Sequence, residues 1–210
     1  MSAQSKPLRL FVASSNQGKL REYRALASAA KAPIELDLIP DFDAVPPYEE
    51  TASTFAENAA GKALYYSRFS QGMVLADDSG LVVPALGGAP GVHSARYAGL
   101  DASDADRIRK LLQEMHGKNG EERHARFVCI LVLAEGGEAR GLFSASAEGV
   151  LLEAPRGNHG FGYDPIFLFP ALGKTYAEIS GEEKNMYSHR GKAFRKALEF
   201  LLSETRDLPV

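Results

Sequence analysis

Residues 8–30 read LRLFVASSNQGKLREYRALASAA, and this stretch contains the pattern that decides the fold. Leu8 to Ala13 is a short apolar run of the kind that forms a strand, and the polar run from Ser14 to Lys19 ends it. From Leu20 onward, apolar residues recur every three or four positions, which is the stripe of an amphipathic helix. The order of strand, loop and helix predicts the first β–α step of an α/β fold.

The same alternation of strand-like and helix-like patterns continues along most of the 210 residues. Gly136 and Gly137 separate two long apolar runs and favour a hairpin, which adds an antiparallel pair to the sheet. A domain usually takes ~100–200 residues. We therefore predict an α/β fold with a mixed sheet, built as one domain over residues 1–210. The remaining predicted elements are strands over residues 34–39, 73–76, 126–134 and 139–152, apolar runs at 81–86 and 166–169, helices from about residues 54 and 103, and a terminal helix that carries Phe194.

The composition argues against several classes of function. Hydrophobic residues make up 45% of the chain and charged residues 24%, which is typical of a globular protein and not of a disordered one. No apolar run approaches the ~20 residues needed to cross a bilayer, so we expect no membrane partner. The net charge of −3 comes without a basic stripe, which argues against nucleic acid as a partner. The single cysteine, Cys129, excludes an internal disulfide and fits a cytoplasmic location.

The polar run between the first strand and the first helix is a candidate anion site. Its residues, Ser14 to Lys19, lead directly into the helix, where unpaired backbone N–H groups and the positive end of the helix dipole favour an anion. Lys19 adds a full positive charge at the same place. The run is too short to be a Walker A loop. The alternative is a capped turn with an exposed lysine.

Two adjacent acids, Asp77 and Asp78, follow the predicted strand over residues 73–76. Ligands of open α/β sheets gather at the carboxyl ends of strands, and Mg²⁺ is held there by one or two carboxylates together with phosphate oxygens. Glu49 and Glu50, in an acidic loop, are further candidate metal ligands. The alternative is a type I turn whose acids face solvent.

Two later stretches hold groups that suit a nucleotide. The loop from Arg156 to Pro165 contains three glycines and two aromatic residues, so the backbone can approach a ligand while a ring offers a stacking face. Asp164 can accept hydrogen bonds from a purine edge; a surface Ω-loop is the alternative. Lys184, His189 and Arg190 are donors that a bound anion would bridge, unless they form a solvated helix face.

Taken in order, these stretches resemble the inosine triphosphate pyrophosphatase family, bacterial enzymes that cleave dITP, ITP and XTP. The resemblance runs from about residue 8 to residue 200, and its most specific phrases are Gly160 to Phe167 and Ser188 to Gly191. Two departures stand out, since Ser14-Ser15 replaces the family's Thr-Gly and Tyr187 replaces a smaller apolar residue. The other stretches that carry the resemblance are Ser14 to Lys19, Glu49 to Thr51 with Thr54-Phe55 and Glu57 to Ala59, Ala76 to Leu81, Gly87 to Gly91 with Ser94 to Tyr97, and Glu183 to Asn185.

The resemblance implies a two-lobed α/β fold, with an elongated mixed central sheet flanked by helices and a substrate cleft between the lobes. It also implies a homodimer, a requirement for Mg²⁺, and hydrolysis of abnormal purine nucleoside triphosphates to the monophosphate and pyrophosphate, which cleanses the nucleotide pool. Asp78 would be the general base and a metal ligand, with Glu49 or Glu50 sharing the metal. The residues that would bind the substrate are Ser14, Ser15, Asn16, Gln17, Gly18, Lys19, Lys62, Ser79, Phe161, Gly162, Tyr163, Asp164, Lys184, His189 and Arg190.

Two other functions compete with this one. The septum-formation-inhibitor-like pyrophosphatases act on modified or pyrimidine nucleotides, but the phrases at Asp77 to Gly80 and Ser188 to Gly191 fit the inosine family better. A nucleotide-binding regulatory module without turnover would need the lysines and the aromatic loop but not the acids. A structural protein that binds no phosphate leaves four polar stretches unexplained. We therefore expect an enzyme.

Overall fold

The structure is a computed structural model that describes residues 7–14, 16–31, 33–40 and 42–204. Ser15, one of the residues predicted to bind phosphate, lies outside the described residues. The chain forms two compact units: the first comprises residues 1–78, 130–144 and 193–210, and the second comprises residues 79–129 and 145–192. None of the helices within the described ranges is both long enough and apolar enough to cross a bilayer.

In the part of the chain that the structure describes, seven strands form one mixed sheet. They are β1 (Leu8–Val12), β2 (Ile34–Leu38), β3 (Met73–Val82), β4 (His124–Glu135), β5 (Glu138–Leu151), β6 (Phe167–Phe169) and β7 (Lys174–Thr175), in the order β2-β1-β3-β4-β5-β6-β7. β1 pairs in parallel with β2 and β3, whereas β6 pairs antiparallel with β5 and β7. Strands β3, β4 and β5 each continue from one unit into the other. The prediction of an α/β fold with a mixed sheet is confirmed.

The hairpin between β4 and β5 turns at the two glycines that the sequence singled out. Gly136 and Gly137 have φ angles of 60° and 87°. A two-residue turn with both φ angles positive matches the right-handed twist of the flanking strands, and glycine adopts it without a steric penalty. The two longest strands of the sheet therefore lie side by side.

Within the described residues, five α-helices accompany the sheet. They are α1 (Gln17–Ala30), α2 (Phe55–Tyr66), α3 (Asp104–Glu114), α4 (Gly181–Tyr187) and α5 (His189–Glu204), with short 3₁₀ helices at η1 (Phe42–Ala44), η2 (Ser67–Phe69), η3 (Pro84–Leu86), η4 (Gly91–Arg96), η5 (Gly120–Arg123) and η6 (Asp164–Ile166). The predicted caps are present, since the Thr54 side chain accepts from the backbone N–H of Glu57 and Ser103 forms a capping box with Asp106. Such caps satisfy N–H groups that the helix itself leaves unpaired.

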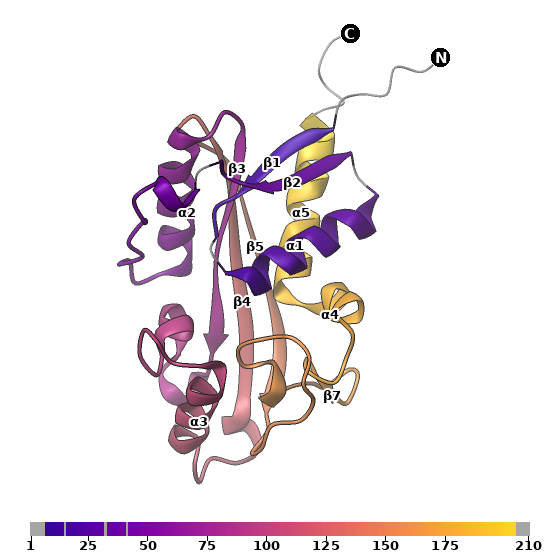
Figure 1. Ribbon diagram of the computed structural model, residues 1–210. Helices are drawn as coiled ribbons and strands as arrows, with labels where there is room; N and C mark the ends of the chain where they lie inside the picture. The colour runs from indigo at the N-terminus through magenta and orange to yellow at the C-terminus, as the bar shows by residue number, and fades with distance from the viewer. Residues whose placement is uncertain (1–6, 15, 32, 41, 205–210) are drawn as a thin grey trace. The chain divides into compact units, whose positions relative to one another are not determined.

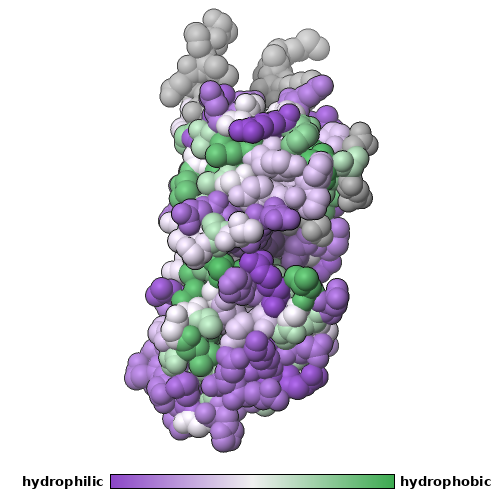
Figure 2. Space-filling model, turned by 90° about the vertical axis from the view of Figure 1, so that its left-hand side faces the viewer, coloured by the Kyte–Doolittle hydropathy of each residue, from purple (hydrophilic) through white to green (hydrophobic). Residues whose placement is uncertain are grey.

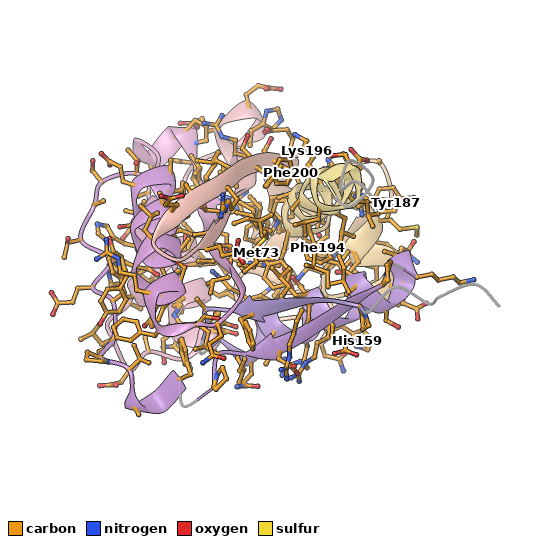
Figure 3. All side chains as sticks on the ribbon, turned by 90° about the horizontal axis from the view of Figure 1, so that it is seen from above. Met73, His159, Tyr187, Phe194, Lys196 and Phe200 are labelled. Atoms are coloured by element: carbon orange, nitrogen blue, oxygen red, sulfur yellow. The ribbon has the colours of Figure 1, made fainter. Side chains whose placement is uncertain are left out.

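In the first unit, helices cover both faces of the sheet. Figure 1 shows α2 on one side of the strands and α1 with α5 on the other. On the α2 side, Ala59 and Ala63 pack against Phe11 of β1. On the other side, Tyr23 of α1 meets Phe194 of α5 with ring centroids 5.4 Å apart, and Figure 3 labels Phe194 on its helix. Burying both faces explains why β1 ends in three successive buried apolar residues, Leu10, Phe11 and Val12.

The structure corrects one prediction about β3. The sequence predicted a strand ending at residue 76, with the acids just after it and a type I turn there as the alternative, but β3 continues without interruption to Val82. The acids fit within the strand because each carboxylate finds a polar partner there, as described below. The predicted apolar run at 81–86 also divides, since its last three residues form η3.

The second unit has its own core. Leu111 of α3 and the C-cap residue of this helix, Met115, pack with Phe127 of β4, Phe167 of β6 and Tyr176, and all five side chains are buried. On the face drawn in Figure 2, hydrophobic residues form separate patches among hydrophilic ones. Such scattered apolar exposure is ordinary for a globular protein.

Candidate functional site

The first unit brings six polar side chains together, and we call this group the charged cluster. Its members are Lys19 of α1, Glu50 of the loop before α2, Asn58 and Lys62 of α2, and Asp77 and Asp78 of β3. Asn58, Lys62, Asp77 and Asp78 are buried. The stretches predicted to hold phosphate and those predicted to hold metal therefore meet within one unit.

The two adjacent acids of β3 have different partners. Asp77 accepts from the ammonium of Lys19, with the Nζ to Oδ2 distance at 2.9 Å. Asp78 accepts from the side-chain amide of Asn58, with the Nδ2 to Oδ2 distance at 3.1 Å. Because successive side chains of a strand point to opposite faces, one acid meets α1 and its neighbour meets α2.

The pKa of Asp78 is raised from 3.8 to about 6. Burial of the carboxyl is the largest cause, because a low dielectric disfavours the charged form, and the negative charge of Glu50 adds to it. Lys19, Lys62 and the hydrogen bond from Asn58 act in the opposite direction. A carboxylate with a pKa near the working pH is suited to accept a proton during catalysis.

Lys62 lies among three carboxylates. Burial lowers the pKa of its ammonium, but the negative charges of Asp77, Glu50 and Asp78 and a hydrogen bond to Glu50 outweigh this effect, so the net shift is upward. Its direct ion-pair partner is Glu50. Glu49, by contrast, is exposed to solvent. Lys62 therefore keeps its positive charge in a place that excludes most of the solvent.

The loop before α1 is held by its own side chains. The hydroxyl oxygen of Ser14 accepts from the backbone N–H of Asn16 at 3.2 Å, and the side chain of Asn16 accepts from the N–H of Lys19 at 3.1 Å. Gln17 is exposed, whereas Gly18 is buried. Asn16 thus caps α1, and the first turn of this helix carries Lys19 into the charged cluster.

The charged cluster contains two carboxylates, Asp78 and Glu50, that could hold a metal ion. Within the ranges that the structure describes, no three or more His, Cys, Asp or Glu side chains gather as a metal-holding group. Mg²⁺ needs less from the protein, since one or two carboxylates suffice when phosphate oxygens complete its shell. Asp78 and Glu50 are such a pair, because the charge of Glu50 raises the pKa of Asp78 and a cation would relieve this repulsion. The donors present fit Mg²⁺ bound together with a phosphorylated substrate.

In the second unit, Asp164 organises the loop of residues 156–165, which we call the aromatic loop. Asp164 is 2% exposed, and its Oδ2 accepts from the ammonium of Lys184 at 2.5 Å and from the backbone N–H of Phe161 at 2.9 Å. A Cβ on Gly160 would lie 2.1 Å from the same oxygen, so only glycine fits there. The Lys184 ammonium lies 4.8 Å from the centroid of the Phe161 ring. Asp164 therefore fixes both an aromatic ring and a cation.

Arg190 and His189 begin α5. Arg190 lies near the Phe161 ring, whereas His189 is buried in the core. Arg190 donates to the hydroxyl of Ser79 at 2.8 Å, and its guanidinium lies 5.6 Å from the centroid of Phe161. His189 is buried and stacks on Phe127, with centroids 4.8 Å apart and planes 10° apart. The Tyr163 hydroxyl donates to the carbonyl of Ser94 at 3.0 Å.

The second unit therefore brings together seven of the residues predicted to bind substrate. They are Ser79, Phe161, Gly162, Tyr163, Asp164, Lys184 and Arg190, with His189 packed beside them on Phe127. The contacts made by Tyr163 and Asp164 are with the protein itself. Their predicted contacts with substrate stay predictions, as do those of the other residues.

The sequence did not lead us to predict Asn58 as a site residue. This residue is fully buried, donates to Asp78, and also bonds the backbone of Ala52 through both ends of its amide. It thereby joins the loop that carries Glu50 to the strand that carries Asp78. Its position could have identified it, because Asn58 is a polar residue on the apolar stripe of α2, next to Ala59.

Comparison with known proteins agrees with this geometry. The model of the Ham1 family matches residues 10–200. The chain belongs to the Ham1 family. Among relatives of this Ham1-family chain, a protein of Geobacillus kaustophilus named dITP/XTP pyrophosphatase is 52% identical over 187 residues, covering 89% of this chain and 91% of the relative. A Thermus thermophilus protein with the same name is 50% identical over 194 residues, covering 91% of each chain.

A solved Ham1-family structure has the same fold. The HAM1 protein from Coxiella burnetii superposes with a TM-score of 0.81 at 40% sequence identity, covering 93% of this chain and 99% of that one. The resemblance to the inosine triphosphate pyrophosphatases is thus confirmed at the level of family and fold. The match spans nearly the whole chain, including both the charged cluster and the aromatic loop.

Proposed function

We propose that this Ham1-family chain hydrolyses abnormal purine nucleoside triphosphates, among them dITP, ITP and XTP, to the monophosphate and pyrophosphate. The names of its relatives support the substrate class. The observation that carries the chemistry is Asp78, a buried carboxylate whose pKa is about 6 and which feels the charges of Lys19 and Lys62. Such a group accepts a proton from water at neutral pH beside cations that attract phosphate.

In the proposed reaction, water attacks the α-phosphorus and the bond from this atom to the bridging oxygen of the β-phosphate breaks. Pyrophosphate leaves, and the proton of the attacking water passes to Asp78. Negative charge builds up on the leaving group, so fixed positive charges lower the barrier. Lys19 and Lys62 supply these charges, and their ion pairs with Asp77 and Glu50 hold them in place.

The second unit supplies groups that suit the base. Phe161 offers a ring for stacking, and Lys184, His189 and Arg190 are donors for a purine carbonyl. Hypoxanthine and xanthine carry a carbonyl at the 6-position, whereas adenine carries an amino donor there. A donor facing a donor leaves a buried polar group unsatisfied, which costs about 1–3 kcal/mol. This mismatch is the proposed basis for rejecting ATP.

We further propose Mg²⁺ as the cofactor, with Asp78 and Glu50 as its protein ligands. When bound, this ion would neutralise phosphate charge. The preference for Glu50 over Glu49 follows from their surroundings, since Glu50 acts on Asp78 and Lys62 whereas Glu49 is exposed. The chain would act in the cytoplasm as a homodimer, which sedimentation at several concentrations tests.

Glu49 and Glu50 form a matched pair for testing the ligand assignment. We expect Glu50→Gln to raise the Mg²⁺ concentration for half-maximal activity by about tenfold, because it removes one of two anionic ligands. Glu49→Gln should leave this concentration within about twofold of the wild-type value. The measurement is pyrophosphate release during a Mg²⁺ titration. Equal effects of the two substitutions would contradict the assignment.

A nucleotide panel tests the function itself. Pyrophosphate and monophosphate are quantified with ITP, dITP and XTP, and compared with ATP, GTP, dTTP and UTP, in Mg²⁺ and in EDTA. We expect turnover of the first three only, and only with Mg²⁺. Release of orthophosphate in place of pyrophosphate would refute cleavage at the α-phosphorus, and preference for dTTP or UTP would refute the purine assignment.

A further inference from the structure

The aromatic loop is tied to α3 by a residue that the proposed function does not use. Asp104, the first residue of α3, accepts from the backbone N–H of Gly162, with the N to Oδ2 distance at 2.7 Å. Its other oxygen accepts from the guanidinium of Arg107 at 2.5 Å. Arg107, one turn further along α3, therefore fixes the orientation of the carboxylate. Hydrogen bonds to an ionised group are stronger than those between neutral partners.

The two amides that flank the Phe161 side chain thus have separate carboxylate acceptors. The N–H of Phe161 donates to Asp164, and the N–H of Gly162 donates to Asp104. Asp164 belongs to the aromatic loop itself and is bound to Lys184, whereas Asp104 comes from a different element, almost sixty residues earlier in the chain. These N–H groups belong to the two peptide planes on either side of the Phe161 Cα. Holding both planes restricts the backbone angles of Phe161 and with them the direction of its side chain.

The hydrogen bond to Asp104 is important because a cavity separates the aromatic loop from α3. A hollow of about 520 Å³ lies between α3 and the aromatic loop, with Ile108 and Leu112 on its α3 side and Phe161 on its loop side. Side-chain packing between the loop and the helix is interrupted over this volume. Asp104 and Gly162 both line this cavity. The hydrogen bond between them therefore connects the loop to the helix at the edge of the cavity.

We propose that Asp104 is a positioning residue that holds Phe161 in the orientation in which its ring stacks on the purine base. This inference rests on the proposed function for its consequence in catalysis, but the orientation of the loop is measurable without substrate. Asp104 would act through Gly162 and Phe161, without touching the nucleotide. Its loss should therefore weaken base binding and leave the bond-breaking groups of the charged cluster intact.

Two substitutions at this position separate its hydrogen bond from its charge. Asp104→Ala removes the acceptor, and we expect KM for ITP and XTP to rise by about tenfold while kcat changes by less than about threefold. Asp104→Asn keeps an oxygen acceptor and loses only the charge, so it should restore most of the wild-type KM. It also remains informative if the alanine variant folds poorly.

Asp106→Ala is the matched control. Asp106 lies in the same first turn of α3 and caps the helix with Ser103, and its carboxylate oxygens accept from Ser103 and Arg109. Its loss should lower stability through the cap, by an amount typical of N-caps, with KM unchanged. If Asp104→Ala and Asp106→Ala raised KM equally, Asp104 would have only a structural role.

A spectroscopic probe makes the test independent of activity. The chain contains no tryptophan, so Phe161→Trp introduces a single indole at the tip of the loop. In this background, Asp104→Ala should increase quenching by acrylamide and lower the fluorescence anisotropy, whereas Asp104→Asn and Asp106→Ala should not. Unchanged fluorescence together with unchanged KM in a protein that hydrolyses ITP would overturn the positioning role and leave the proposed function standing. Changed fluorescence, when the wild-type protein is inactive on ITP, would overturn the proposed function alone.

Discussion

Asp78 combines three features that rarely coincide in one carboxyl group. It is 5% exposed, it accepts a hydrogen bond from a fully buried amide, and its pKa is raised to about 6. A buried carboxylate with no role in chemistry would be expected to sit in a direct ion pair, as Asp77 does with Lys19. The position of Asp78 beside cations without a direct ion pair to them favours a catalytic role.

We expect Asp78→Asn to lower kcat for ITP by at least ~100-fold, the lower end of the range for loss of a general base. Asparagine has the same shape and can still accept from Asn58, so the fold should survive. The measurement is steady-state pyrophosphate release, with circular dichroism to verify folding. Near-normal turnover of the folded variant would show that another group activates the water.

The same substitution has a pH-dependent effect on stability. A carboxyl whose pKa is raised from 3.8 to about 6 on folding destabilises the folded state wherever it is ionised, which corresponds to about 3 kcal/mol. The destabilisation is complete above pH 6, diminishes as the pH falls through about 6, and is absent below about 3.8. In buffer containing EDTA, we therefore expect Asp78→Asn to be more stable than the wild type at pH 7.5, with a smaller difference at pH 5.

Urea unfolding of both proteins at the two pH values measures this difference. Asn58→Ala is a useful comparison, because it removes the hydrogen bond that favours ionised Asp78 and leaves the carboxyl in place. Its effect on stability should therefore grow as the pH rises. A stability difference between wild type and Asp78→Asn that is the same at pH 5 and pH 7.5 would contradict the raised pKa.

At the scale of single elements, β3 shows why the sequence located the acids correctly but misjudged their backbone. Two adjacent acids followed by serine and glycine are typical of a turn. The strand continues through them because Lys19 and Asn58 reach it from helices more than eighteen residues away in the sequence. Such long-range partners leave no local signal, whereas the helix caps at Thr54 and Ser103 depend on neighbours within three residues and were predictable.

The short helix η5 contributes a buried arginine that joins three elements. Arg123 donates to the carbonyls of Leu151 and Leu152 at the end of β5 and to those of Met115 and Lys118 after α3. The planar guanidinium fork serves all four acceptors at once, which an ammonium group cannot do. Arg123 thus stabilises the second unit through backbone carbonyls.

We expect Arg123→Lys to lower the free energy of unfolding by about 2–3 kcal/mol, because at least two buried carbonyls lose their donor. Arg126→Lys is the matched control, since Arg126 is exposed on the same stretch of chain and should change stability by less than about 0.5 kcal/mol. Urea unfolding gives both values. KM for ITP should stay close to the wild-type value in both variants, and a large rise in KM for Arg123→Lys would assign this residue to the site as well.

For the whole molecule, the alternation of apolar patterns was enough to predict the α/β class and the mixed sheet, because both depend on local periodicity and on one glycine hairpin. The order of the strands was not predictable in the same way, since pairing joins segments such as β1 and β3 that are sixty residues apart. The same distinction between local and long-range information applies to the candidate site. Charged residues were identified by type and spacing, while Asn58 and Asp104 gain their roles only from what the fold brings beside them.

The continuity of β3, β4 and β5 through both units has a consequence for unfolding. Two of them, β3 and β4, contribute to the core of the first unit through Val74 and Val132 and to that of the second through Leu81 and Phe127. Neither core can therefore be lost while these two strands keep their pairing. We therefore expect the two units to unfold in a single cooperative transition, despite their separate cores.

Leu111→Ala tests this expectation, because Leu111 is fully buried in the second unit and its truncation should cost about 2–5 kcal/mol. Native-state hydrogen exchange reports the free energy of opening for each helix separately. In a cooperative molecule, the slowest amides of α2, in the first unit, lose as much protection as those of α3. Leu20→Ala, in the buried face of α1, is the reciprocal variant and should weaken α3 equally. If the amides of α2 kept their full protection in Leu111→Ala, the first unit would be stable independently of the second, and the expectation would be wrong.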